Sequence, residues 1–322
     1  MIKKTIAVFL AAYACAGLSA SAAAQDAYPS KSITVISPHQ AGGATELLIR
    51  LLSEDMTASL GQSLVIVAQP GAAGTIGAKA VSDSKPDGYT LLANPSMHVM
   101  YPGMFKKLAF DPIKDFVPVG VLGTTPIVVV VSANSPYKTF EELMAAAKKG
   151  GVSFASGGLG SLPHLTGEMV ANRAGVTMTH VAYNGNAQAL VDVAGGHVDA
   201  LYSSVSSAES LVKGGKLRAL AVSSKDRIDA LPDVPTIAES GMPGFDVTNW
   251  YAVWAPKNTD PKIVAKLNEA MRQAASLPKT KERMQALSVT SSTMTAEEFS
   301  AFCESENKVW LDVMKKANLQ PN

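Results

Sequence analysis

The chain has few cysteines, few aromatic residues and no excess of charge of one sign. Its 322 residues include two cysteines, and 6% of them are aromatic. Lysine and arginine number 28, and aspartate and glutamate number 27, so the net charge is +1. This balance gives no electrostatic reason to bind nucleic acid or an anionic membrane surface. We therefore expect neither as a partner.

The first 24 residues have the pattern of a secretory signal peptide. Two lysines precede an apolar run over residues 5–18, and the small-residue segment SASAAAQ follows it. The run is shorter than the roughly 20 residues that cross a bilayer, so an uncleaved anchor is the weaker interpretation. A lipid anchor on Cys15 is a minor alternative, because the bulky Tyr13 lies just before it. We expect cleavage after Ala24 and a periplasmic location.

Cleavage would leave little disulfide or metal-binding chemistry. Cys303 would be the one remaining cysteine, so no disulfide could form within the chain. The five histidines are scattered, and no pair has the HExxH spacing of a zinc site. The remaining 298 residues hold 26 basic and 27 acidic side chains, and they lack a second apolar stretch long enough to cross a membrane. We expect no metal, no cofactor and no membrane insertion.

Short apolar segments alternate with segments of helical periodicity along most of the chain. The apolar segments read SITVIS, SLVIVA, YTLLAN, PIVVVVS, VSFAS, MTHVAY, VDALYSS and LRALAVS. This alternation is typical of βαβ units and parallel sheets. Thr139 followed by Glu142 forms a capping box, which predicts a helix from Phe140. The predicted fold class is α/β.

The order of the segments predicts two lobes joined by two crossover strands. A proline-rich tract, residues 231–245, separates the last of these segments from WYAVWAPK, and two strongly helical segments follow at 261–276 and 295–317. We expect the chain to cross near Pro126 and to return near Trp250, so that these two helices pack on the first lobe. Trp250 and its aromatic neighbours would then pack in the core or the hinge. The predicted boundaries are 25–126 plus 250–322 for lobe 1 and 127–249 for lobe 2.

Residues 38–45 form a glycine-containing loop between a predicted strand and a predicted helix. Ligands of open parallel sheets bind beyond the carboxyl ends of the strands, against helix N-termini. Gly42 and Gly43 would let backbone N–H groups approach an anion, and the helix from Glu46 would add unpaired donors and its positive dipole end. The alternative is that the glycines only make a tight turn and that Glu46 only complements the helix dipole.

The second lobe repeats this arrangement. The strand predicted over residues 152–156 runs into SGGLGS, and Pro163 suits the first turn of the helix that follows. A third loop of the same type spans residues 183–187. Several such loops that face one cleft favour an anion-binding site over a set of unrelated turns.

Enzyme motifs fit these loops less well. Neither glycine loop matches the dinucleotide fingerprint or the GK[ST] ending of a P-loop. Ser161 and His164 suggest a nucleophile and a base, but Ser161 lacks the glycines two residues away on either side that a nucleophile elbow needs. A structural His164 is the preferred interpretation, and a hydrolase is the less favoured alternative.

Motifs along the whole mature chain carry a family resemblance. They read, in order, YPSKSITVISPHQAGGATELLIRLL, LGQSLVIVAQPGAAGTIGAKAV, PDGYTLL, ASGGLGSLPHLTGEM, VAYNGNAQALVDVAGGHVDA, GKLRALAVSS, LPDVPTIAESGMPGF and APKNTDPKIVAKLNEAM. With the signal peptide before them, the chain resembles the Bug family of periplasmic solute-binding receptors of tripartite tricarboxylate transporters. The resemblance implies a two-lobe type II periplasmic-binding-protein fold, in which each lobe is a mainly parallel sheet flanked by helices.

The resemblance also implies a function without chemistry. A small carboxylated ligand (a mono-, di- or tricarboxylate) would be captured by closure of the lobes of a monomer and delivered to the membrane permease. Two alternatives remain open. One is a receptor that presents its ligand to a sensor protein, and the other is an extracytoplasmic hydrolase that uses Ser161 and His164.

The ligand residues implied by the resemblance lie in the strand-to-helix loops. In lobe 1 they are Pro38, His39, Gln40, Gly42, Gly43 and Thr45, with Asn94 and Ser96 from the loop after YTLLAN. In lobe 2 they are Gly160, Ser161, His164, Tyr183, Asn184, Gly185 and Ala187. Two positions depart from the family pattern Pro-Phe-x-x-Gly-Gly-x-x-Asp, because His39 replaces the aromatic residue and Glu46 replaces the shorter acid. The identity of the ligand acid stays open.

Overall fold

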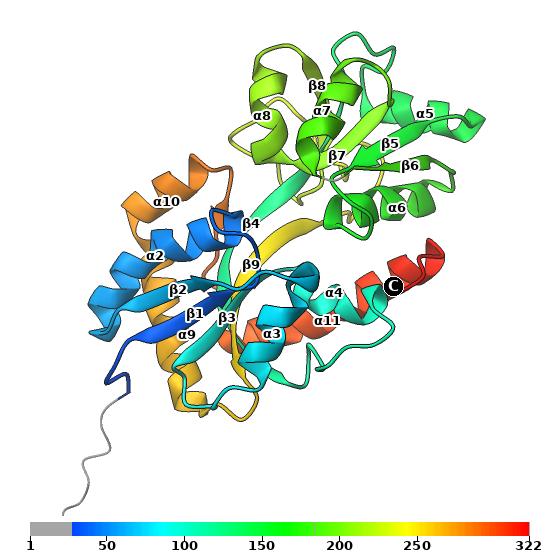
Figure 1. Cartoon of the computed structure of the whole chain (residues 1–322). Coiled ribbons are helices and arrows are strands. Elements are labelled where there is room, and N and C mark those ends of the chain that lie inside the picture. The colour runs from blue at the N-terminus through cyan, green and yellow to red at the C-terminus, as the bar shows by residue number, and fades with distance from the viewer. Residues whose placement is uncertain (1–27, 184, 322) are drawn as a thin grey trace, which may run out of the picture.

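The computed structural model of the chain describes residues 28–183 and 185–321, and these form two α/β lobes (Figure 1). Over the described residues, a ten-stranded sheet runs through both lobes in the order β2-β1-β3-β9-β4-β7-β5-β6, and β8 and β10 pair with β4 beside this path. The signal-peptide prediction concerns residues outside the described part. The α/β class and the two-lobe architecture are as expected.

The first lobe is built on a mixed sheet. Its strands are β1 (Ile33–Ser37), β2 (Leu64–Ala68), β3 (Thr90–Pro95), β9 (Thr248–Pro256), the first part of β4 (Phe116–Ser132) and the short β10 (Thr290–Ser291). β1 pairs in parallel with β2 and β3, whereas β9 runs antiparallel to β3 and β4. The crossover strands therefore add antiparallel pairs to the parallel pairs that the alternating pattern predicts.

Helices cover both faces of this sheet. One face carries α2 (Ala44–Leu60), α9 (Pro261–Ser276) and the short α10 (Pro278–Gln285). The other face carries α3 (Thr75–Ser82), α4 (Met97–Met104) and α11 (Ala296–Lys316). Within β1, Val35 packs in the core under α2, while the next residue, Ile36, packs in the core on the opposite face. Burial on both faces explains why the strand reads as a continuous apolar run.

The second lobe has the same layered construction. Its strands are the second part of β4, β7 (Ala200–Ser204), β5 (Ser153–Ser156), β6 (Thr179–Ala182) and β8 (Leu217–Val222). β5 is parallel to β6 and β7, and β4 is antiparallel to β7 and β8. The helices are α5 (Phe140–Lys149), α6 (Leu162–Ala174), α7 (Asn186–Ala194) and α8 (Val205–Lys213).

β4 changes partner where the chain passes between the lobes. Pro126 is the last residue that pairs with β9, opposite Thr248, and Ile127 pairs with Ser204 of β7. Trp250 and Trp254 on β9 are almost completely buried. They belong to a core cluster that also contains Phe154 of the second lobe and Trp310 of α11. The aromatic residues near the crossing thus pack in the core, as expected.

Several local details differ from the sequence prediction. The helix expected from Glu46 begins two residues earlier, at Ala44, with Gly43 as its N-cap. The Thr139 hydroxyl caps α5 by accepting from Glu142 N–H at 3.3 Å, but the Glu142 carboxylate accepts from Lys138 N–H and not from the N-cap residue. Helices α4, α8 and α10 were not expected, because Pro102 lies inside the first, α8 joins two closely spaced strands, and Pro278 begins the third.

Candidate functional site

A carboxylate from the first turn of α2, that of Glu46, holds the loop between β1 and α2. Gly42 has a φ of +82°, in the left-handed region that favours glycine. Its N–H donates to Glu46 Oε2 at 3.0 Å, and Arg50 Nε donates to Glu46 Oε1 at 2.8 Å. These bonds, first that of Arg50 and then that of Gly42, lower the pKa of Glu46. Glu46 is therefore ionised, and its carboxylate fixes the loop conformation by accepting from Gly42 N–H.

The hydrogen bond from Gly42 to Glu46 limits which backbone groups of the loop are free to bind a ligand. The Gly42 N–H is taken by Glu46, and the Gly43 N–H donates to Gln40 O at 3.3 Å. The two backbone amides that we expected to bind an anion therefore already donate to groups of this chain. The first-turn amides of α2 and the Thr45 side chain, which is 4% exposed, are the groups that remain at this helix N-terminus.

His39 and Asn94 meet at the carboxyl ends of β1 and β3. His39 Nε2 lies 2.9 Å from Asn94 Oδ1, and Asn94 Nδ2 donates to the Tyr101 hydroxyl at 3.1 Å. Burial lowers the pKa of His39, which keeps its ring neutral. Tyr101 in turn donates to Ala73 O at 2.9 Å, in the short helix η1 (Ala72–Gly74). The structure thus brings a third strand-to-helix connection, residues 68–75, up to the predicted loop.

The other predicted residues of this lobe have structural partners. Pro38 is buried against the start of α3, where a Cβ on Gly77 would lie 2.8 Å from Pro38 Cβ. Ser96 is also buried, and its hydroxyl donates to Asn249 Oδ1 at 2.8 Å. Ser96 therefore ties the end of β3 to the crossover strand β9, and Gln40 lies exposed on the loop.

The glycine loop before α6 is a network of short hydrogen bonds. Gly160 has a φ of +73°, and its N–H donates to His164 Nδ1 at 3.0 Å. Ser161 is the N-cap of α6, and its hydroxyl donates to Gly158 O at 2.7 Å. His164 is 1% exposed, in agreement with a structural histidine.

This geometry does not pair a nucleophile with a base. The Ser161 hydroxyl hydrogen points to Gly158 O, and His164 Nδ1 receives the Gly160 N–H. The other ring nitrogen, Nε2, lies 3.5 Å from Glu168 Oε1. A serine nucleophile needs the base nitrogen within hydrogen-bond reach of its oxygen, and neither ring nitrogen of His164 has Ser161 as its partner.

The loop between β6 and α7 packs on the glycine loop. Gly185, with a φ of +109°, donates its N–H to Gly157 O at 2.9 Å. The Tyr183 hydroxyl donates to Asp192 Oδ2 at 2.6 Å, which directs the side chain along α7. Ala187 is exposed in the first turn of α7, and the predicted Asn184 lies outside the described residues.

The sequence prediction placed Asn186 in the third loop without a ligand role, and it did not include Ser207. The Asn186 side chain donates to Ser207 Oγ at 3.2 Å, while its Oδ1 is buried and has no partner among the described residues. Ser207 belongs to the first turn of α8, so the β7–α8 connection forms part of the same loop cluster. The serine-rich segment SSVSS, residues 203–207, could have indicated this loop. It was not identified as a strand-to-helix loop, because no helix was predicted after it.

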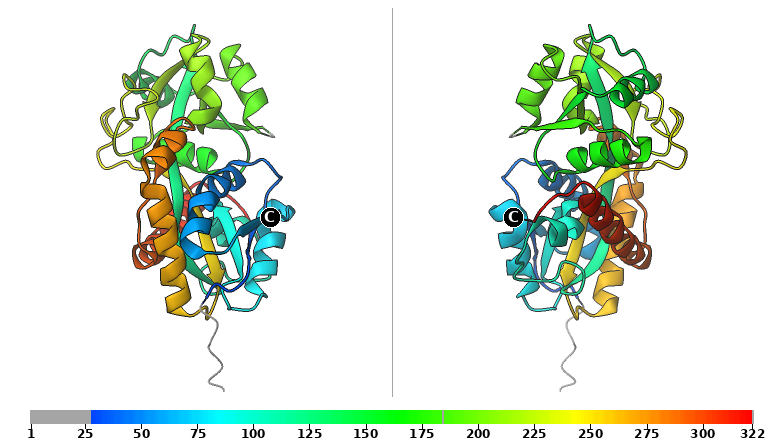
Figure 2. Two further views of the ribbon diagram at one scale, coloured as in Figure 1. Left: turned by 90° about the vertical axis from the view of Figure 1, so that its left-hand side faces the viewer. Right: turned by 90° about the vertical axis from the view of Figure 1, so that its right-hand side faces the viewer.

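The loop clusters of the two lobes face each other. Figure 2 shows that the β1–α2 loop extends toward the second lobe. A Cβ on Gly160 would lie 3.6 Å from Met104 Cε of α4, so the lobes already touch beside the glycine loop. Gly160 therefore lies at the boundary between the lobes, and the β1–α2 loop extends toward that boundary from the first lobe.

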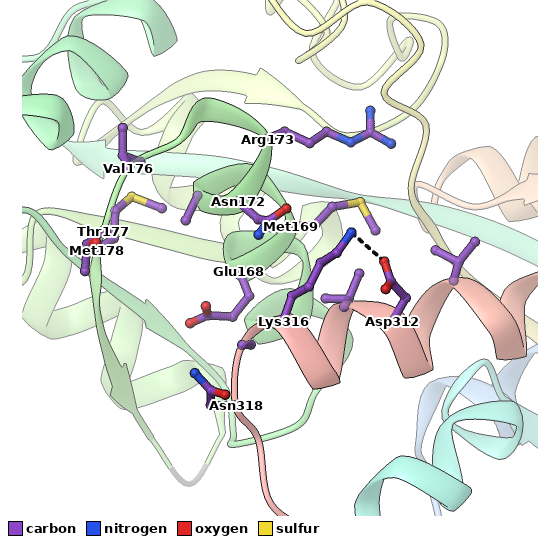
Figure 3. Close-up of a pocket in the computed structure, with 14 residues that line it drawn as sticks. Glu168, Met169, Asn172, Arg173, Val176, Thr177, Met178, Asp312, Lys316 and Asn318 are labelled. Atoms are coloured by element: carbon purple, nitrogen blue, oxygen red, sulfur yellow. Dashed lines mark ion pairs between the residues drawn. The ribbon is translucent and has the colours of Figure 1, made fainter.

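A hollow lies between the lobes, between α6 and α11. This pocket has a volume of about 540 Å³ and contains none of the predicted ligand residues. Glu168, Met169 and Asn172 line it from α6, and Asp312 and Lys316, an ion pair at 2.7 Å, line it from α11 (Figure 3).

The described part of the chain spans residues 28–183 and 185–321. In these ranges, no helix combines the length and the apolar character that a membrane span requires. The same ranges contain no group of three or more His, Cys, Asp or Glu side chains placed to hold a metal ion.

Comparison with known proteins gives a consistent set of relatives. The chain matches the family model described as tripartite tricarboxylate transporter family receptor over residues 48–319. Protein BugT of Bordetella pertussis is 35% identical, and the match covers 97% of this chain and 95% of BugT.

Two solved structures of Rhodopseudomonas palustris proteins have the same fold. MatC with bound malate is 30% identical, with a TM-score of 0.73 over 89% of this chain and 100% of MatC. A second protein, solved with adipate, is 28% identical, with a TM-score of 0.78 over 92% of this chain and 100% of that protein.

Proposed function

Because the chain belongs to the tripartite tricarboxylate transporter receptor family, we propose that it is a monomeric periplasmic receptor that captures a small organic acid between its lobes for a membrane permease. The bound malate of MatC and the adipate of the second neighbour support a ligand with at least one carboxylate. The receptor performs no chemistry, in keeping with the separate partners of Ser161 and His164.

One observation carries this proposal: the joined loops before α6 and α7 lie at the boundary between the lobes, and the loop before α2 extends toward them from the first lobe. The loops before α2, α6 and α7 read SPHQAGGAT, SGGLGS and YNG, without any lysine or arginine. A carboxylate would be held there by backbone amides, hydroxyls and the positive ends of helix dipoles. Such donors bind anions without a buried cation, so an empty site leaves no uncompensated charge.

The proposed ligand residues are the predicted set with two changes of role. In the first lobe, the first-turn amides of α2 and Thr45 contact the ligand, while Gly42 shapes the loop around Glu46. In the second lobe, Asn186 joins the predicted residues, because its buried Oδ1 lacks a partner among the described residues. An incoming ligand hydroxyl or amide could supply the missing donor.

The lobe boundaries follow the pairing of β4. We place them at 25–126 plus 250–322 for lobe 1 and 127–249 for lobe 2, with bending at the crossing. The change of partner between Pro126 and Ile127 supports this assignment.

A thermal-shift screen of organic acids tests the proposed function. A ligand that binds only the folded state adds about 2.7 kcal/mol at a hundredfold excess over Kd, which raises the melting temperature measurably. We expect malate, adipate or a related mono- or dicarboxylate to stabilise the protein and neutral sugars to have no effect. Stabilisation by sugars with no response to any acid would refute the proposal.

A further inference from the structure

The lobes also touch on the side of the crossing strands away from the candidate site. The segment of α10 and β10 in the first lobe and residues 227–230 of the second lobe form the two walls of a pocket of about 300 Å³. Pro126, where β4 leaves the first lobe, lies between these walls. Figure 2 shows the orange helices α9 and α10 on the opposite side of the molecule from the β1–α2 loop. The contact is therefore at the back of the crossing.

Two polar contacts join the lobes at this place. The Ser288 hydroxyl donates to Glu209 Oε2 of α8 at 2.8 Å, and Gln285 Nε2 lies 3.4 Å from Asp229 Oδ2. Glu209 also accepts from Lys213 Nζ at 2.6 Å, and this bond, followed by that of Ser288, lowers the pKa of Glu209. Glu209 is therefore ionised, and a hydrogen bond to an ionised acceptor is stronger than one between neutral groups.

Ser288 has a backbone conformation that is uncommon for serine. Its φ is +55°, in the left-handed region that favours glycine. Ser288 N–H donates to Gln285 O at 2.8 Å, and Val289 N–H donates to Met284 O at 3.0 Å, so this residue closes α10 at a position where glycine is usual. Glycine would relieve the strain there but would lack the hydroxyl. Strain at a residue that makes a specific contact points to a function of that contact.

We propose that the hydrogen bond between Ser288 and Glu209 is made in the open receptor and lost when the lobes close, so that both residues set ligand affinity from outside the ligand site. This inference rests on the proposed function, in which the lobes bend at the crossing. Both are positioning residues, because they act through the orientation of the lobes and do not touch the ligand.

The sign of the effect follows from the place of the contact. The crossing strands lie between the contact and the candidate site, so they act as the pivot of the closing rotation. A rotation that brings the loops before α2 and α6 together moves α10 away from α8. Closure then breaks the bond, and the strength of the bond counts against ligand binding.

The loops of the candidate site agree with an open arrangement. Among the residues that the structure describes, the hydrogen bonds of the loop before α2 stay within the first lobe. Those of the loops before α6 and α7 stay within the second lobe in the same ranges. The contact at the back is thus formed while the loops at the front are not joined by hydrogen bonds.

Two variants remove the bond from opposite ends. Ser288→Gly removes the hydroxyl and the backbone strain together, so loss of the bond brings no new strain. Glu209→Ala removes the acceptor. Asn258→Gly is the matched control, because Asn258 is an exposed residue of the first lobe with a φ of +66°. It follows the end of β9 that lies away from the crossing.

The first readout needs no ligand. Urea denaturation of the wild type, of Ser288→Gly, of Glu209→Ala and of the double variant gives a double-mutant cycle, which isolates the bond from the other effects of each change. We expect a coupling of about three- to tenfold in the unfolding constant, because the acceptor is ionised but the bond is partly exposed. Zero coupling overturns the inference.

The second readout is affinity for malate and for adipate, measured by calorimetry. We expect Ser288→Gly and Glu209→Ala to bind about three- to tenfold more tightly than the wild type, because closure no longer breaks the bond. The double variant should bind no more tightly than the better single variant, since both changes remove the same bond. Asn258→Gly should bind as the wild type does.

A merely structural role of Ser288 would not tighten binding. Unchanged or weaker affinity in Ser288→Gly therefore overturns the inference. Coupling between Ser288 and Glu209 with no organic acid bound in the wider screen overturns only the proposed function.

Discussion

Ser161 is the N-cap of α6, and its hydroxyl donates a hydrogen bond within the preceding glycine loop. Oγ donates to Gly158 O at 2.7 Å and accepts from His164 N–H at 3.4 Å. A ligand carboxylate at this helix N-terminus would accept from this hydroxyl once its hydrogen turns away from Gly158 O. The sequence identified the serine, but it could not show that the hydroxyl hydrogen has a partner within the loop.

We expect Ser161→Ala to weaken binding of the best acid from the screen by about ten- to a hundredfold. Loss of a hydrogen bond to a charged group costs about 1.5–3 kcal/mol, and about 1.4 kcal/mol corresponds to a tenfold change. Isothermal titration measures the effect. Ser210→Ala, an exposed serine on α8 away from the loops, is the control and should bind as the wild type does. Unchanged affinity in Ser161→Ala would remove this residue from the site.

Gly42 allows a matched test of backbone conformation. Its φ is +82°, and a Cβ there would meet nothing within 4 Å, so substitution would cause strain without a clash. Gly175, the C-cap of α6, has a φ of +63° and the same open surroundings. We expect both Gly42→Val and Gly175→Val to lose about 1–2 kcal/mol of stability, because a β-branched residue is disfavoured at positive φ.

Binding should separate these two variants. Gly42→Val changes the loop that Glu46 holds, so we expect it to abolish ligand binding, whereas Gly175→Val should keep it. Calorimetry with the same acid decides the matter. Equal affinity in the two variants would show that the β1–α2 loop does not contact the ligand.

Helix α11 and strand β9 are joined by one half-buried carboxylate. Glu306 Oε2 accepts from the indole N–H groups of Trp250 at 3.1 Å and Trp310 at 3.0 Å. Burial raises the pKa of Glu306, since it disfavours the charged form. The folded state therefore holds the Glu306 proton more tightly than the unfolded state. This stabilisation is fully present below the unfolded pKa and is lost as pH rises through the folded value.

We expect Glu306→Ala to lower the free energy of unfolding by about 2–5 kcal/mol, because two buried indole N–H groups lose their acceptor. Glu306→Gln keeps an amide oxygen and should cost less than half as much. Urea denaturation measures both variants, with the exposed Glu304→Ala as control. A Glu306→Ala variant as stable as Glu304→Ala would show that the α11–β9 contact does not depend on this carboxylate.

The spacing of apolar residues in the sequence predicted most helices and strands, whereas the composition of a few helices prevented their prediction. The helices that end the chain and the buried strands were visible as patterns, because their apolar spacing follows the helical and strand periods. α4 was hidden by Pro102, and α8 by its small polar residues.

The candidate site was also predictable in part. Its loops could be predicted from glycines placed between strands and helices, whereas the stacking of His164 on His180 depends on the pairing of β5 with β6, which no local pattern contains.

For the whole molecule, the prediction concerns export. We expect the chain isolated from the periplasm of its host to lack residues 1–24, because Ala22 and Ala24 fill the small-residue positions before the cleavage site. The intact mass of the purified protein measures this directly. A full-length chain, or one that carries lipid on Cys15, would contradict the proposed free periplasmic receptor.

The change of partner along β4 also has a consequence for the engineering of this fold. The chain leaves the first part of the sheet at Pro126 and returns at Thr248, and these two residues are paired neighbours on adjacent antiparallel strands. The segment between them carries the second lobe, and its two ends lie about 5 Å apart. A chimaera that exchanges this segment with that of a relative therefore needs only two junctions, both at one pair of opposed residues. Ligand preference on one side of the site could then be recombined as a single module.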